Sequence, residues 1–145
     1  MKITEKQRIQ LAEVAKEFDL KLLYLFGSHA RGDANEHSDV DLAYLRHDGS
    51  DMPRGTFFSL QGFDDKIENI LGLSESVFDC VNLVTAPPLL GYLIATEGIK
   101  LFGTETDDEK QYIRLLMKYF DAEPLFKATH EYVKTKLLQF EHAAY

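Results

Sequence analysis

The chain has 145 residues, of which 45% are hydrophobic and 28% are charged, a composition typical of one globular domain rather than a disordered chain or a repeat array. Its formal net charge of −8 disfavours direct binding to nucleic-acid backbones, which usually requires a basic surface. A single cysteine, Cys80, excludes an intramolecular disulfide, and no segment has the length of a membrane span or the apolar core of a signal peptide. We therefore expect a cytoplasmic protein without direct nucleic-acid or membrane contacts.

Hydrophobic periodicity and turn residues predict nine elements along the chain. In order, these are a helix over about 4–18, strands over 22–26 and 40–45, a helix over 60–70, a strand over 77–84, a helix over 87–98, a short strand over 99–102, and helices on either side of Pro124. This order predicts an α/β (α+β) fold, in which helices flank a small mixed sheet of about four strands. We expect one domain over residues 1–145, with its core at about 10–105 and C-terminal helices at about 106–145.

Two polar signals refine the predicted helix boundaries. Thr4 with Gln7, and Thr106 with Glu109, have the spacing of capping boxes at helix N-termini. Pro124 is expected to break or kink the C-terminal helical region. The aromatic stripe of that region is more typical of a buried core than of an interface, although its apolar faces could also bind a partner; it contains Tyr112, Tyr119, Phe126, Tyr132 and Phe140.

The strongest functional signal is Gly27-Ser28, followed after ten residues by Asp39-Val40-Asp41. The glycine–serine pair ends one predicted strand and the two aspartates begin the next. Residues i and i+2 of a strand point to the same face about 6.5–7 Å apart, so Asp39 and Asp41 can present two carboxylates side by side. Such a pair can hold two divalent ions about 3.5–4 Å apart. Magnesium is the natural candidate, because it prefers oxygen ligands that it shares with phosphates.

A phosphate-binding turn is predicted beside these carboxylates. Gly27 has no Cβ, so a triphosphate can approach the backbone closely. Ser28 is expected at the start of a short helical turn, where its hydroxyl and free N–H groups can hold phosphate oxygens. Arg31 can add positive charge to the same triphosphate.

Asp79 interrupts an otherwise apolar strand, where an unpaired charge would be costly to bury. If this strand neighbours the one carrying Asp39 and Asp41, Asp79 completes a carboxylate triad. It would then bind one metal ion and help to deprotonate an attacking hydroxyl. The alternative is an ordinary acid on an edge strand.

The segments GSHARG (27–32) and SDVDL (38–42) resemble the minimal nucleotidyltransferase (MNT) family of the DNA polymerase β-like nucleotidyltransferase superfamily. FDCV (78–81) is similar to the third-carboxylate strand of that family, and EGIKLF (97–102) to a segment near its C-terminal end. The resemblance extends over about residues 10–105. It implies the nucleotidyltransferase fold, with His29 at a position where the family often has arginine.

Proteins of this kind are often antitoxins of HEPN/MNT toxin–antitoxin pairs. The resemblance implies transfer of AMP from ATP to a tyrosine hydroxyl of a partner HEPN ribonuclease, which is thereby neutralised. A hetero-oligomer with that ribonuclease is expected. Two other hypotheses remain: transfer to a small-molecule acceptor, and a non-catalytic antitoxin that binds nucleotide and blocks the ribonuclease by occlusion.

Overall fold

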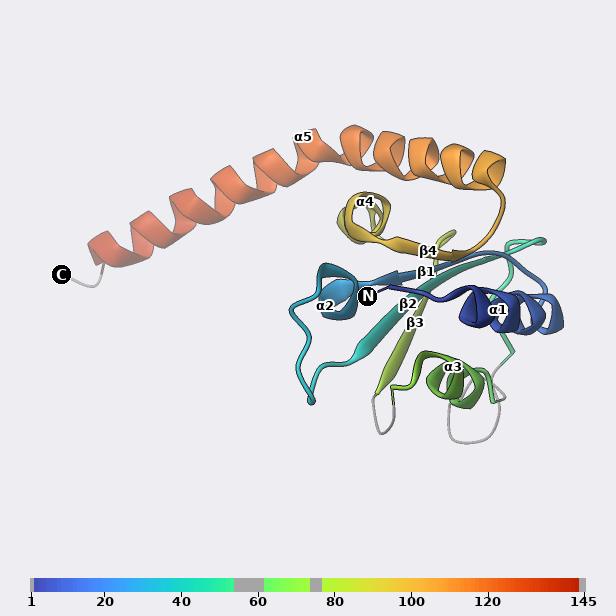
Figure 1. The fold of residues 1–145 in the computed structure, drawn as a ribbon. Coiled ribbons are helices and arrows are strands. Elements are labelled where there is room, and N and C mark those ends of the chain that lie inside the picture. Colours follow the sequence, from blue (N-terminus) through green and yellow to red (C-terminus); the bar gives the residue numbers. More distant parts are fainter. Residues whose placement is uncertain (1, 54–61, 74–76, 144–145) are drawn as a thin grey trace.

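The computed structural model of the chain describes residues 2–53, 62–73 and 77–143, with side chains as far as residue 139. Helices and strands alternate along much of the chain, as the sequence predicts (Figure 1). They are α1 (Glu5–Glu17), β1 (Leu20–Phe26), α2 (Gly27–Arg31), β2 (Val40–Arg46), α3 (Phe63–Leu71), β3 (Phe78–Asn82), α4 (Pro88–Glu97), β4 (Ile99–Phe102) and α5 (Glu105–Ala143).

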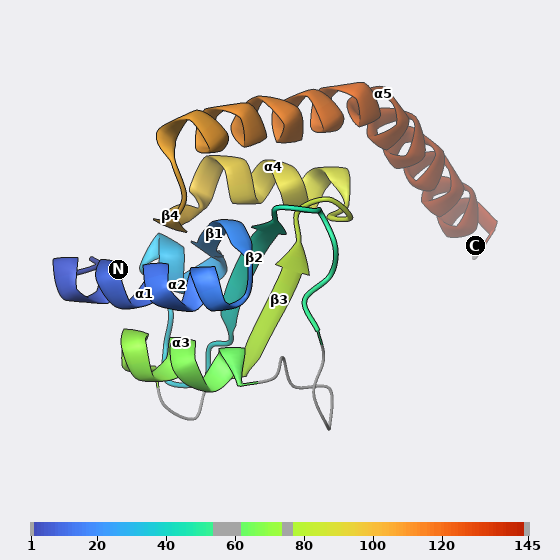
Figure 2. The same cartoon turned by 90° about the vertical axis from the view of Figure 1, so that its right-hand side faces the viewer.

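The described strands form one mixed sheet in the order β3-β2-β1-β4. β1 runs antiparallel to both β2 and β4, whereas β2 and β3 are parallel. Parallel neighbours need a crossover connection, and α3 lies in the segment that joins β2 to β3 (Figure 2). The prediction of a small mixed sheet of four strands is therefore confirmed.

Helices cover both faces of the sheet, which explains why β1 is apolar along most of its length. Leu23 and Leu25 belong to the core beneath α1 and α3, and Leu22 and Tyr24 belong to the core beneath α4 and α5. The β1 side chains thus alternate between two buried faces, as the two-residue period of a strand requires. Figure 1 shows the resulting helix–sheet–helix layers.

The predicted capping box at the start of α1 is confirmed. The Thr4 hydroxyl accepts a hydrogen bond from the Gln7 backbone N–H at 3.2 Å, and the Thr4 backbone N–H donates to Gln7 Oε1 at 2.9 Å. The Gln7 side chain also donates to the Ile70 carbonyl at 2.9 Å, so it joins α1 to the end of α3. Gly72 ends α3 in a left-handed conformation; the first two residues of the helix predicted over 60–70 lie outside the described residues.

The second predicted capping box, Thr106 with Glu109, is wrong. Helix α5 begins two residues earlier than that prediction, and the hydroxyl that accepts from the first turn belongs to Thr104, at 3.1 Å from the Asp107 nitrogen. Pro124 lies inside α5 and does not divide it into two helices. It removes one backbone donor and crowds the preceding turn, and Figure 2 shows that α5 changes direction about half way along its length.

Within the described ranges, no helix combines the length and apolar character that a membrane crossing requires.

Candidate functional site

The end of β1 and the short helix α2 form one wall of the site. Gly27 follows the last residue of β1 with φ +71°, a left-handed conformation that side chains rarely adopt. This glycine lets the chain turn directly from strand into helix, so Ser28 lies in the first turn of α2, as predicted. Gly32 ends the helix, and its N–H donates to the Ser28 carbonyl at 2.9 Å.

The strand register brings the predicted carboxylates to this same end of the sheet. Asp41 is paired with Phe26 of β1 on one side and with Asp79 of β3 on the other. Residues paired in this way have their side chains on the same face, with neighbouring strands about 4.8 Å apart. Asp39 lies one residue before β2. The strand of Asp79 thus neighbours that of Asp41, as a carboxylate triad requires.

Gly27 and Asp41 are in close contact. A Cβ built on Gly27 would overlap the Oδ2 atom of the Asp41 carboxylate, and it would lie 3.1 Å from the carboxylate carbon. A larger residue at position 27 would therefore displace the Asp41 side chain or open the turn. The absence of a side chain at Gly27 thus has a specific consequence: the backbone that begins α2 lies directly against an acidic group.

Burial raises the pKa of the Asp41 carboxyl above its ordinary value, and the neighbouring carboxylates Asp79 and Asp39 raise it further. His29 and Arg31 act in the opposite direction, because they bring positive charge toward the same group. Like charges at short range disfavour joint ionisation. Asp41 is therefore the electrostatic centre of the site, where a cation would be bound most favourably.

The three aspartates lie at the N-terminal ends of β2 and β3, but their side chains do not converge on a common point. Among the described residues, no group of three or more His, Cys, Asp and Glu side chains is arranged to hold a metal ion. Repulsion between like charges opposes closer approach of three carboxylates; it adds to the effect of burial in raising the pKa of Asp41. Their oxygen donors nevertheless have the chemistry that magnesium prefers. The donor set fits the predicted ions, which would offset this repulsion.

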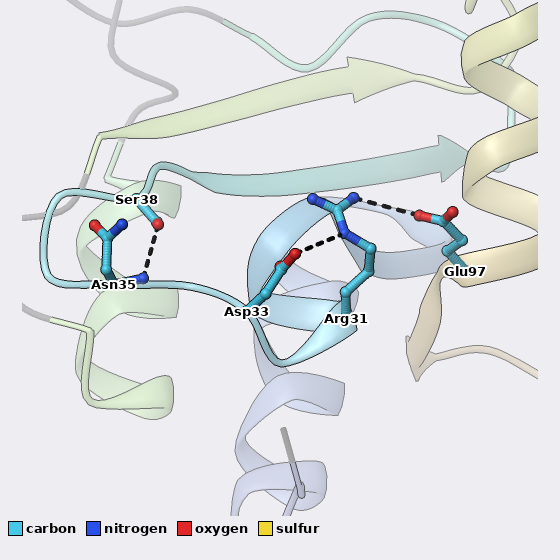
Figure 3. A network of polar contacts seen from close by, with 5 residues as sticks. All are labelled: Arg31, Asp33, Asn35, Ser38 and Glu97. Atoms are coloured by element: carbon cyan, nitrogen blue, oxygen red, sulfur yellow. Dashed lines mark hydrogen bonds and ion pairs between the residues drawn. The ribbon is translucent and has the colours of Figure 1, made fainter.

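Arg31 lies at the end of α2 between two other carboxylates (Figure 3). Its Nε donates to Asp33 at 3.4 Å, and its Nη1 donates to Glu97 at the end of α4 at 3.3 Å. Figure 3 shows the second terminal nitrogen pointing away from Glu97. The ion pair with Glu97 also raises the pKa of the guanidinium, and Asp33 raises it further. The arginine is therefore held in place while part of its donor fork stays accessible.

Glu97 is a neighbour of Arg31 that the sequence did not predict. It lies 66 residues after Arg31, and only the fold brings α4 beside α2. Its place in the EGIKLF segment was visible in the sequence, but its contact with Arg31 was not.

The loop between α2 and β2 adds a second local feature: the Asn35 N–H donates to the Ser38 hydroxyl at 2.9 Å, so the loop turns just before Asp39 (Figure 3).

This combination of a mixed sheet, a glycine–serine turn and paired carboxylates on adjacent strands defines a nucleotidyltransferase. Residues 9–107 match the family described as polymerase beta, nucleotidyltransferase. This match covers more than half of the chain, so the chain belongs to that family.

Proteins similar to the chain include an adenylyltransferase and chains of toxin–antitoxin complexes. Protein adenylyltransferase MntA of Shewanella oneidensis is 32% identical over 100 residues, which are 69% of this chain and 66% of the relative. The matched part is thus just under two thirds of the relative's length. A chain from a crystal structure of a toxin–antitoxin with AMP-PNP is 25% identical, with a TM-score of 0.67 over 88% of this chain and 98% of that chain.

A further solved structure supports the fold alone. It contains a tri-AMPylated Shewanella oneidensis HEPN toxin in complex with an MNT antitoxin. The matched chain is 23% identical, with a TM-score of 0.62 over 90% of this chain and 98% of that chain.

Gly27→Ala is expected to destabilise the protein more than Gly32→Ala. Both glycines have positive φ, so both substitutions carry a backbone cost of about 1–2 kcal/mol. Only the new methyl group at position 27 overlaps Asp41, whereas a Cβ at position 32 meets nothing within 4 Å. Urea unfolding of the two variants measures the difference. Equal losses would show that the close contact with Asp41 imposes no constraint.

Asp41→Asn is expected to raise the melting temperature of the metal-free protein at pH 7. The pKa of Asp41 is raised in the folded state. The free energy of unfolding therefore falls as the pH rises from the unfolded-state pKa through the folded-state pKa, and this loss remains at higher pH. The asparagine removes the cost. Asp48→Asn is the matched control: hydrogen bonds from Ser50 lower the pKa of Asp48, so its loss should not stabilise the protein. A lower melting temperature for Asp41→Asn would contradict this account.

Proposed function

We propose that this chain is an antitoxin nucleotidyltransferase, which transfers AMP from ATP to a tyrosine hydroxyl of a HEPN-family ribonuclease and thereby neutralises it. The observation that carries the proposal is the pairing of Asp41 with Asp79 beside Gly27, in a chain of the polymerase beta nucleotidyltransferase family. The similarity to a protein adenylyltransferase supports a protein as the acceptor. ATP is abundant in the cytoplasm, and we assign the reaction to that compartment.

The nucleotide would bind at the turn between β1 and α2. Gly27 leaves room for phosphate oxygens close to the backbone, and Ser28 offers a hydroxyl and an N–H in the first turn of the helix. Arg31, held by Asp33 and Glu97, directs its remaining donors to the triphosphate. These contacts would place the α-phosphorus near the N-terminal ends of β2 and β3.

Asp39, Asp41 and Asp79 would hold two magnesium ions, which neutralise charge on the attacking and leaving oxygens when they are bound. Asp79 accepts the proton of the acceptor hydroxyl. The tyrosine oxygen then forms a bond to the α-phosphorus, in line with the bond to pyrophosphate that breaks. AMP ends on the acceptor and pyrophosphate leaves.

The direct test is the intact mass of a HEPN-family ribonuclease after incubation with this chain, ATP and magnesium. We expect an increase by one or more AMP groups and a loss of ribonuclease activity. Asp39→Asn, Asp41→Asn and Asp79→Asn should each abolish the increase while retaining the fold, because each removes a carboxylate from the site. Asp48→Asn, at the opposite end of β2, is the control that should transfer normally.

An unchanged ribonuclease mass together with inhibition would favour occlusion and contradict the proposal. Transfer of label from ATP to a small molecule, but not to the ribonuclease, would favour the small-acceptor alternative. Undiminished transfer by the aspartate variants would rule out the assigned carboxylates.

Glu97→Gln is expected to raise the KM for ATP by a factor of up to about five, with little change in kcat. An exposed ion pair contributes about 0.2–1 kcal/mol, and here it holds Arg31 in place. Arg31→Ala should raise KM further. Glu17→Gln, which breaks the exposed ion pair of α1 with Lys66, is the control. A lower KM for Glu97→Gln would show that Glu97 competes with the phosphates for Arg31.

A further inference from the structure

The two halves of α5 have different environments. The first half packs on α4: Leu115 is 3% exposed, the Tyr119 ring stacks on Tyr92 with centroids 4.3 Å apart, and Lys118 donates to the Ala86 carbonyl at 2.8 Å. In the second half, every residue from 125 to 139 is exposed. The expectation that the aromatic stripe of this region is core is therefore wrong for Tyr112, Phe126 and Tyr132, which are 45%, 38% and 63% exposed; the Phe140 side chain lies outside the described part.

The second half of α5 extends away from the domain (Figures 1 and 2). Leu138 lies apart, and the other five large apolar residues lie on one side of the helix together with Lys136. At 100° per residue they cover an arc of about 140°. This distal stripe consists of Leu125, Phe126, Tyr132, Val133 and Leu137. Part of it borders a shallow groove, which is lined by His130, Val133, Lys134, Leu137 and Leu138.

A helix that exposes such a stripe gains little stability on its own, because most helix stability in proteins comes from packing of the apolar face. Leu125 is 68% exposed, Tyr132 63% and Leu137 60%. Large contiguous apolar surfaces of this kind mark sites of protein association. The distal stripe therefore has the character of a binding surface.

Charge indicates the kind of partner. Residues 125–139 contain three lysines against one glutamate, Glu131, whereas the whole chain has a net charge of −8. Lys127 forms an ion pair with Glu123 at 3.1 Å, so Lys134 and Lys136 supply most of the local positive charge. Pairing two copies through these helices would bring like charges together. An apolar surface with an acidic rim complements the stripe instead.

We propose that the distal stripe of α5 is the docking surface for the protein acceptor, and that it binds an apolar patch with an acidic rim on that acceptor. This inference rests on the proposed function. An acceptor bound to this stripe is tethered to the domain that carries the carboxylates, which raises its effective concentration at the site.

The test is the affinity of the full chain for the HEPN-family ribonuclease, measured by calorimetry. Val133→Glu and Leu137→Glu should each weaken binding at least about tenfold, as for central apolar contacts of an interface. Val84→Glu is the matched control: Val84 is 52% exposed and Val133 47%, and Val84 follows β3 at the opposite end of that strand from Asp79. All three positions are exposed, so the fold and ATP binding should be retained.

Charge reversal tests the chemistry of the partner. Lys127→Glu with Lys134→Glu should weaken binding, and wild-type binding should weaken as salt rises. AMP transfer by the Val133→Glu variant should fall at low acceptor concentration and recover at high concentration.

Several outcomes would overturn the docking proposal. Wild-type affinity in Val133→Glu and Leu137→Glu would do so while leaving the proposed function intact. Self-association of the chain that these variants abolish, with ribonuclease binding unchanged, would assign the stripe to a second copy. A wild-type chain that neither binds nor modifies the ribonuclease would contradict the proposed function as well.

Discussion

The site depends on one constraint: the parallel register of β2 and β3 places the carboxylates of Asp41 and Asp79 opposite each other. Two like charges on neighbouring strands oppose folding unless something offsets them. The sheet tolerates the pair because it lies at the end of the strands, where Asp79 is exposed and Asp41 is only partly buried. Core residues continue along β2 beyond it, and the partly buried Cys80 and Val81 continue along β3. A buried hydrophobic framework thus supports a local arrangement that is electrostatically unfavourable by itself.

Other features of the site follow from this pairing. Antiparallel pairing of β1 with β2 brings Phe26 beside Asp41, so the next residue must turn away without a side chain, and Gly27 does so. The turn starts α2, which carries Ser28 and Arg31. Helix α4 then reaches Arg31 through Glu97. The groups proposed to bind phosphates and metal ions therefore meet at one end of one sheet, as transfer of a nucleotidyl group would require.

Much of this arrangement could be predicted from the sequence, because the decisive signals are local. The apolar run ending at Gly27, the aspartates two residues apart, and the lone acid in the strand of Asp79 each depend on a few neighbouring residues. The contact of Arg31 with Glu97 could not be predicted, since it depends on how α4 packs against α2. Whether Thr104 or Thr106 caps α5 was also ambiguous: both threonines precede acidic residues, and the position at which β4 ends decides between them.

The long C-terminal helix shows another limit of prediction. Apolar periodicity at residues 125–137 indicates a face that should be covered, but it does not say whether this chain or another one covers it. Pro124 bends α5 without ending it, and the helix thereby leaves the surface of α4 and extends beyond the domain (Figure 2). The same type of pattern therefore describes a face that is partly buried against α4 in the first half, where Leu115 is 3% exposed, and an exposed face in the second.

The most direct measurement is anomalous diffraction from crystals of the chain with Mn²⁺ and a non-hydrolysable ATP analogue. The account predicts manganese bound to the carboxylates of Asp39, Asp41 and Asp79, with the phosphates against Gly27 and Ser28. Manganese bound elsewhere, or a nucleotide lying away from the turn between β1 and α2, would contradict it.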